Sequence, residues 1–205
     1  MLDLVAKTPV REIHLFDDDV LLNHNAFRAP GAVSLEELRE RPLKVDHYAS
    51  LYQRFRRQII PHPNRLGEGN AHELDEMDFV FLCMDGGPDK RAVVERLEAS
   101  GASFVDTGIG LDEEDGSIGG IVRVTTSTAQ QRQHVWDARR ISFDDPDEEA
   151  NEYARNIQVA DLNALNACLA VVRWKKLCGF YRDLEREHHS LYTMDGNHLL
   201  NEDQA

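Results

Sequence analysis

Residues 78–87 read DFVFLCMDGG and join a short apolar run to a double-glycine turn. The run from Phe79 to Cys83 suits a strand that is covered on both faces of a sheet. The Gly-Gly-Pro that follows predicts a turn into a helix, which we expect to end at Gly101. Residues 103–106 then predict the next strand. This strand, helix, strand order is typical of a parallel sheet with helices on its faces.

The segment before residue 78 predicts the same kind of unit. Residues 11–16 alternate in polarity and run into three aspartates, which indicates a strand. A short helix after Ser34 and a longer one from Lys44 follow, and then a short strand at 59–60. Because residues 10–107 repeat strand, helix, strand, we expect an α/β, Rossmann-like, doubly wound and mostly parallel sheet.

The C-terminal half predicts fewer parallel units. Residues 116–126 read as a strand, whereas the acidic stretches 112–116 and 144–149 read as exposed loops. A long helix is expected over 151–177. A terminal β-hairpin should follow, with Asp195 and Gly196 supplying the positive φ angles of its turn. We expect residues 1–205 to form one domain.

Composition limits the functions that fit this chain. With 37 acidic and 23 basic residues, the formal net charge is −14, which disfavours nucleic acid and anionic membranes as partners. No apolar run approaches the roughly 18 residues of a membrane span, and no signal peptide is evident. We therefore expect a cytoplasmic protein. Its three cysteines form no CxxC pair and are expected to be reduced and packed.

Several polar residues follow the predicted strands in a pattern that suits a nucleotide. Asp17 ends a strand of the predicted sheet, where a carboxylate can accept hydrogen bonds from ribose hydroxyls. Acids at strand ends are also common turn formers, so both roles stay open for Asp17. Asn25, Arg28 and Lys44 add an amide donor and two fixed positive charges for polyphosphate oxygens. Asp85 ends the strand at 79–83 and could hold Mg²⁺ through oxygen.

These residues together resemble the ThiF/MoeB-like branch of the ubiquitin-activating-enzyme superfamily. In that family a strand ends in a D-x-D segment followed by an Asn and an Arg, as in Asp17, Asp19, Asn25 and Arg28 here. A Lys opens the following helix, as Lys44 does. A later strand ends in Cys-Thr-Asp, where this chain has Cys-Met-Asp at 83–85. The likeness covers most of residues 2–180.

The resemblance implies a site and a reaction. Asp17 would contact ribose, and Asn25, Arg28 and Lys44 would contact the phosphates. Asp19 would belong to the same nucleotide-binding site, and Asp85 would bind Mg²⁺. The implied activity is ATP-dependent adenylation of the C-terminal carboxylate of a ubiquitin-like or sulfur-carrier protein. Arg28, Lys44 and Asp85 would then carry catalysis, with ATP and Mg²⁺ as cofactors. Because residues 107–167 contain no cysteine, we expect no thioester on this chain.

Further partners are implied only by the resemblance. The sequences of residues 23–32 and 187–197 suggest a bacterial subgroup. In such systems, activating proteins accompany conjugating-enzyme-like proteins and JAB-type peptidases. Family members commonly form dimers, so the implied partners include a second copy of the chain.

The N-terminal residues of the chain depart from the family pattern. The family begins with a strand and a GxGGxG loop whose backbone lies against the phosphates, whereas residues 2–7 read as the helix that would follow. We therefore expect a chain that is truncated relative to the family, with poor stability or poor ATP affinity. Without that central strand, two strand edges would stay unpaired.

Two rival functions come from other classes. A nicotinamide-dependent oxidoreductase also uses an acid after the second strand, and ATP-specific binding would exclude it. A non-catalytic interaction module of the same fold would keep a docking face but bind no nucleotide. The nine histidines show no metal-ligand spacing such as His-x-x-x-His, so we expect solvated or hydrogen-bonded histidines.

Overall fold

The computed structural model describes residues 1–144 and 159–204, and its strands form two separate sheets. The smaller sheet pairs two parallel strands, β1 (Ile13–Phe16) and β2 (Ile59–His62). The larger sheet has five strands in the order β3-β4-β5-β6-β7. These strands are β3 (Phe79–Leu82), β4 (Ser103–Glu114), β5 (Ser117–Ser127), β6 (His189–Thr193) and β7 (His198–Glu202).

This topology confirms the α/β class and corrects the expected single sheet. In the larger sheet β3 and β4 are parallel, whereas every later pair is antiparallel. The larger sheet is therefore mixed rather than mostly parallel. The physical reason is the tight turn at Asp115 and Gly116, whose φ angles are 52° and 76°, because it folds β5 directly back onto β4. The acidic segment 112–116 is thus mainly the end of β4 rather than a loop.

The helices begin and end largely where local chemistry indicates. They are α1 (Leu2–Ala6), α2 (Asn23–Ala26), α3 (Leu35–Glu40), α4 (Lys44–Tyr52), α5 (Pro88–Ser100), α6 (Gln133–Asp137) and α7 (Ala160–Leu177), with a 3₁₀ turn, η1 (Ala71–Leu74). Ser34 and Glu37 exchange side-chain hydrogen bonds in a reciprocal cap of α3. Gly101 ends α5 with a φ of 87°.

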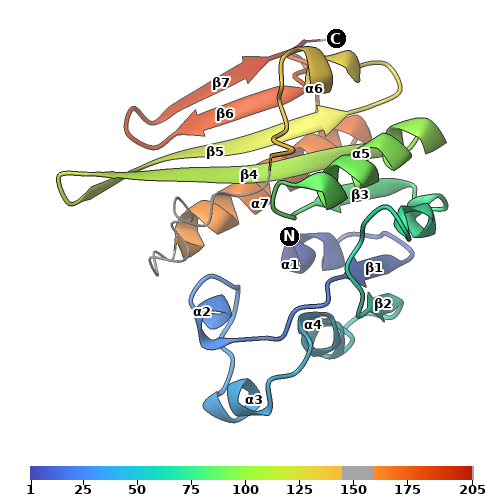
Figure 1. Ribbon diagram of the computed structural model, residues 1–205, viewed down its shortest axis with the longest axis vertical. Helices are drawn as coiled ribbons and strands as arrows, with labels where there is room; N and C mark the ends of the chain where they lie inside the picture. The colour runs from blue at the N-terminus through green and yellow to red at the C-terminus, as the bar shows by residue number, and fades with distance from the viewer. Residues whose placement is uncertain (145–158, 205) are drawn as a thin grey trace.

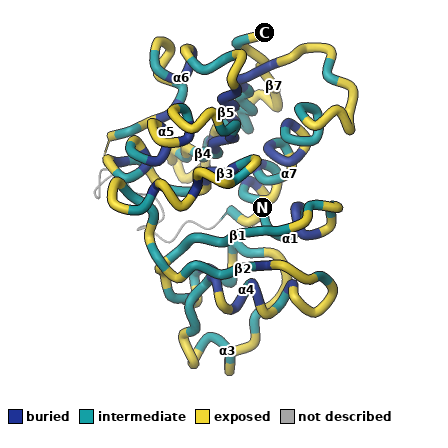
Figure 2. The backbone as a smooth tube through the Cα atoms, turned by 90° about the vertical axis from the view of Figure 1, so that its right-hand side faces the viewer, coloured by how far each residue is buried: buried dark blue, intermediate teal, exposed yellow. Residues whose placement is uncertain are grey.

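The helices cover both faces of the larger sheet (Figure 1). Helix α7 packs against β4 and β5, and α5 lies on the opposite face. Under α5, the buried cluster contains Val93, Val94, Leu97 and Phe104. Figure 2 shows that β4 and β5 carry buried residues, whereas β1 has none. The larger sheet therefore holds the better-shielded core.

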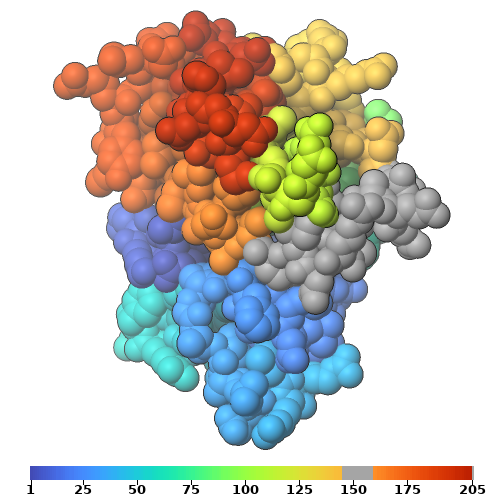
Figure 3. Space-filling model, turned by 90° about the vertical axis from the view of Figure 1, so that its left-hand side faces the viewer, coloured from blue at the N-terminus to red at the C-terminus, as the bar shows by residue number. Residues whose placement is uncertain are grey.

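The smaller sheet has a core of its own. Ile13 and Leu15 of β1 pack with Ile59 of β2 against α4, in a cluster that also includes Leu2 and Ala6 of α1. Met1 instead packs against the cluster under α7. The N-terminal helix thus joins the two parts through side chains. In Figure 3, the segment around α2 and α3 lies at one end of the molecule and the β6–β7 hairpin at the other.

Three finer expectations have mixed outcomes. The terminal hairpin is confirmed, but its positive φ of 50° lies at Asn197 rather than at Asp195 and Gly196. Helix α7 is confirmed from Ala160, whereas its expected start at 151 and most of the acidic segment 144–149 lie outside the described residues. The cysteines are not packed, because Cys83, Cys168 and Cys178 are all exposed.

Candidate functional site

The three aspartates after β1 form a compact turn. The backbone N–H of Asp19 donates to Oδ1 of Asp17 at 2.8 Å, which is a local side-chain turn of the kind aspartate favours. Asp17 is half-buried, and Asp18 and Asp19 are exposed. The turn-forming role of Asp17 is therefore present, and its second carboxylate oxygen faces Lys44.

Lys44 fastens the start of α4 to this turn. Its backbone N–H donates to the carbonyl of Asp19 at 2.9 Å. Its Nζ lies 2.5 Å from Oδ2 of Asp19 and 3.7 Å from Oδ2 of Asp17. Since the Lys44 side chain is only 19% exposed, it is held in place by packing as well as by charge. The structure therefore brings Asp17, Asp19 and Lys44 together, as the sequence predicts.

Asn25 lies on α2 and Arg28 lies just after it. Asn25 is buried, and its Oδ1 accepts the N–H of Leu22 at 2.8 Å, so this oxygen stabilises the helix start. Partial burial and the charges of Arg28 and Lys44 lower the pKa of His24. Burial raises the pKa of Tyr48, on which Arg28 and Asp17 act in opposite directions. Arg28 therefore shares the electrostatic environment of Asp17 and Lys44.

Asp85 occupies the turn between β3 and α5. It is exposed, and Gly87 caps the helix with a φ of 120°. The adjoining backbone is fixed, because the buried Lys90 donates from Nζ to the carbonyl of Met84 at 3.1 Å. Lys90 also lies 2.6 Å from the fully buried Asp106 at the end of the parallel part of β4. The buried Lys90–Asp106 ion pair therefore stabilises the turn that carries Asp85.

An ion pair between Arg65, in the loop after β2, and Asp89 of α5 links the two sheets. The sequence alone indicated neither residue. Nε of Arg65 donates to Oδ2 of Asp89, in the first turn of α5, at 2.7 Å. This contact and the charges of Asp18 and Asp19 raise the pKa of Arg65. No motif marks Arg65 in the sequence, because its role depends on the loop after β2 reaching α5.

Within residues 1–144 and 159–204, one group of acids could hold a metal ion. Asp17, Asp18 and Asp19 can place one oxygen each within 4.8 Å of one another. Three hard oxygen donors suit Mg²⁺ or Ca²⁺. The group does not include Asp85, so the magnesium role of Asp85 stays a prediction, and Asp18 is an additional candidate.

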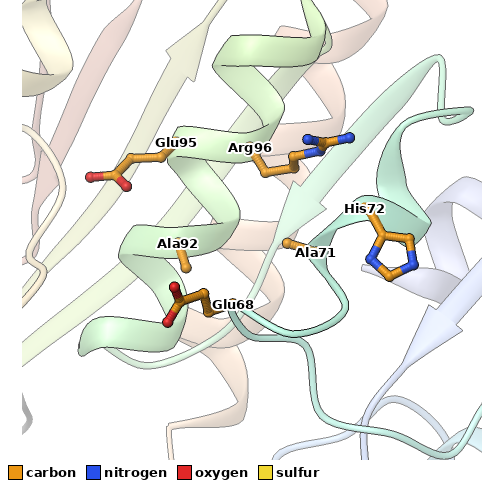
Figure 4. A pocket seen from close by; sticks show the side chains of 6 residues that line it. All are labelled: Glu68, Ala71, His72, Ala92, Glu95 and Arg96. Carbon is orange, nitrogen blue, oxygen red and sulfur yellow. The ribbon is translucent and has the colours of Figure 1, made fainter.

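Two open depressions lie away from the predicted residues. One, of about 400 Å³, is lined by Glu68, Ala71, His72, Ala92, Glu95 and Arg96 between η1 and α5 (Figure 4). In that view His72 points away from Glu68 and the start of α5. The other, of about 460 Å³, lies between η1 and the smaller sheet and includes His14, Phe16 and His62. Neither includes Asp17, Lys44 or Asp85.

No protein-family model matches this chain, and no curated protein matches it. Among solved structures, selenomethionine PaaA aligns over 98% of this chain and 67% of its own, with a TM-score of 0.70 and 12% identity. E. coli MccB, solved with MccA-N7isoAsn, aligns over 98% of this chain and 60% of its own, with a TM-score of 0.68 and 12% identity.

These findings correct the family assignment. At 12% identity the two likenesses extend to the fold alone, and no family model supports membership. The assignment of this chain to the ThiF/MoeB-like family is therefore wrong. The chain shares a fold with MccB and spans three-fifths of that protein's length.

None of the helices within residues 1–144 and 159–204 is both long and apolar enough to cross a bilayer.

Proposed function

We propose that this chain is the nucleotide-binding part of an enzyme that uses ATP to adenylate a C-terminal carboxylate on a peptide or small protein, such as a ubiquitin-like or sulfur-carrier protein. The observation that carries the proposal is Lys44, held beside Asp17 and Asp19 at the end of a parallel strand. In open α/β sheets, ligands bind at that end of the strands. The fold shared with MccB, solved with MccA-N7isoAsn, supports a peptide substrate.

The roles follow from the positions of the groups. Asp17 would accept hydrogen bonds from ribose hydroxyls, and Lys44 and Arg28 would bind phosphate oxygens. Asp85 would hold Mg²⁺, and the oxygens of Asp17, Asp18 and Asp19 also fit a hard cation. When bound, Mg²⁺ neutralises phosphate charge.

Catalysis of this reaction depends mainly on aligning the carboxylate with the α-phosphorus of ATP. A carboxylate oxygen attacks the α-phosphorus, a new P–O bond forms, and the bond to the departing pyrophosphate breaks. The chain's own contribution is to orient the phosphates and stabilise the charge that develops on them. No protein nucleophile takes part, which agrees with the absence of cysteine from residues 107–167.

Local charge imposes a condition on nucleotide binding. Lys44 is paired with Asp19 at 2.5 Å, so part of its positive charge is balanced by the three aspartates of the turn. An ATP polyphosphate would be repelled unless a divalent cation accompanied it. We therefore expect binding of Mg-ATP and no binding of ATP in EDTA.

Calorimetry with Mg-ATP and pyrophosphate exchange test the proposal. Lys44→Met and Asp85→Ala should each abolish binding, whereas Lys7→Met and Asp195→Ala, which change exposed residues elsewhere, should not. Equal Mg-ATP affinity in wild type and Lys44→Met would refute the assigned site. Exchange of pyrophosphate should require an added carboxylate-bearing peptide or small protein.

The acidic turn also favours a second candidate, a non-catalytic interaction module. The observation that favours this candidate is the same Lys44–Asp19 ion pair. A lysine that is already paired with an aspartate has less positive charge available to bind a phosphate. A partner that binds equally to wild type and Asp85→Ala, with no Mg-ATP binding by either, would support this candidate over the enzyme.

A further inference from the structure

Residues 140–144, which we call the strap, lie directly on the turn that carries Asp85. A Cβ atom added to Gly86 would lie 2.5 Å from the carbonyl oxygen of Asp144 and 3.5 Å from that of Ser142. The first distance is too short for any side chain, so only glycine permits this approach of the two backbones. Figure 1 shows the strap running from α6 across β5 and β4 toward the start of α5.

The first two residues of the strap are fixed to the larger sheet. The carbonyl of Arg140 accepts hydrogen bonds from Nη1 of Arg123 at 2.7 Å and from Oγ1 of Thr125 at 3.3 Å, both on β5. Ile141 is 2% exposed and belongs to the buried cluster under α5. The strap therefore starts from a rigid base.

Phe143 anchors the other end of the strap to two helices. Its ring stacks on Trp136 of α6, with centroids 5.0 Å apart and planes 24° apart. The guanidinium carbon of Arg91, on α5, lies 5.4 Å from the Phe143 centroid and 5.5 Å from the Trp136 centroid, where a cation is attracted to both rings. Nε1 of Trp136 donates to Oε2 of Glu98 at 2.8 Å, which fixes the indole on α5 as well.

The turn before α5 is thus held on two sides. Beneath it, Nζ of the buried Lys90 donates to the carbonyl of Met84 at 3.1 Å. Above it, the strap contacts Gly86. Asp85 lies between these two fixed points and is itself exposed. Its backbone is therefore constrained while its carboxylate stays accessible to a ligand.

We propose that Phe143 is a positioning residue for Asp85. Anchored by Trp136 and Arg91, it holds the strap on Gly86 and so fixes the turn that presents the Asp85 carboxylate to Mg-ATP. The nucleotide part of this inference rests on the proposed function, in which Asp85 is the magnesium ligand. Phe143 acts through the backbone, in the way that outer groups orient the ligands of a metal and change its affinity by about 10–100-fold.

Nuclear magnetic resonance relaxation of the ¹⁵N-labelled chain tests the contact without any nucleotide. In Phe143→Ala, the order parameters of Gly86 and Gly87 should fall from about 0.85, typical of rigid backbone, to below about 0.6. Phe143→Tyr keeps the ring and should keep the turn rigid. The control is Leu162→Ala, which removes a buried side chain on the opposite face of the sheet. Circular dichroism verifies that each variant is folded.

Calorimetry with Mg-ATP tests the positioning role. Phe143→Ala should bind Mg-ATP roughly tenfold more weakly than wild type, whereas Phe143→Tyr and Leu162→Ala should bind it with unchanged affinity. A residue that only stabilises the fold would give equal affinities in all four folded proteins, because each is measured well below its unfolding temperature.

Two results would overturn the inference. Equal order parameters for Gly86 and Gly87 in wild type and Phe143→Ala would show that the strap does not fix the turn. A loosened turn with unchanged Mg-ATP affinity would remove the positioning role. If wild type binds no Mg-ATP, the proposed function fails and the positioning of a nucleotide ligand fails with it, while the order parameters still decide whether Phe143 fixes the turn.

Discussion

Removing the buried charge of Asp106 should cost more stability than any exposed charge change in this chain. Asp106 has no exposed surface, and it lies 2.6 Å from Nζ of Lys90 and 2.7 Å from a guanidinium nitrogen of Arg123. The substitution Asp106→Asn keeps the shape of the side chain and removes its charge. Lys90, whose side chain is 4% exposed, then keeps its charge but faces only neutral acceptors, the new amide oxygen and the Met84 carbonyl.

The expected magnitude follows from burial. Breaking a buried ion pair by neutralising one partner costs about 3–5 kcal/mol, because the other charge stays desolvated. With a urea dependence of about 2 kcal/mol per molar, the unfolding midpoint should fall by about 2 M. Since domains of this kind are stabilised by about 5–15 kcal/mol, the variant should remain largely folded without denaturant only if the wild type is in the upper part of that range.

Urea unfolding followed by far-ultraviolet circular dichroism measures this. The control is Asp75→Asn, which breaks the exposed pair with Arg96 and should change the midpoint little because solvent screens that pair. Adding Lys90→Met to Asp106→Asn removes the stranded charge and should recover part of the loss. Equal midpoint shifts for Asp106→Asn and Asp75→Asn would refute the reasoning.

Two further predictions concern pH and packing. Burial, with the charges of Arg140 and Arg123, lowers the pKa of His189 from 6.5 to about 4. The contribution of neutral His189 to the free energy of unfolding is therefore fully present above pH 6.5 and is lost as the pH falls toward 4, by at most about 3 kcal/mol. Urea unfolding midpoints at pH 7 and pH 4 measure this loss, and the loss should be smaller in His189→Asn. Gly86→Ala would place a Cβ 2.5 Å from the carbonyl oxygen of Asp144, at a cost of about 1–3 kcal/mol. A thermal melt should show this loss relative to Gly69→Ala, whose Cβ would meet nothing within 4 Å, and matching melts would contradict it.

The sequence was a good guide wherever structure depends on near neighbours. The cap at Ser34, the left-handed Gly101 and the terminal hairpin were all predictable, because their signals lie within a few residues. The clustering of Asp17, Asp19 and Lys44 was predictable for a related reason, since a strand end and the start of the following helix lie at the same edge.

Other features depend on partners that are distant in the chain. The split into two sheets could not be predicted, because apolar strand patterns do not say which edges pair. The contact of His14 with His62 depends on the register of two strands 48 residues apart. The exposure of the cysteines is likewise tertiary, because Cys168 lies on the solvent side of α7 although the helix pattern around it is apolar.

The separation of the two sheets divides the molecule into regions that should open independently. No backbone ladder joins β1 to β3 in the part of the chain that the structure describes, so packing by Met1 and Phe16 and the Arg65–Asp89 ion pair connect the regions. Such side-chain contacts break at a lower free energy than a continuous hydrogen-bonded sheet. Amide hydrogens of β1 and β2 should therefore exchange faster than those of β4 and β5, and ligands at the acidic turn should slow that exchange first.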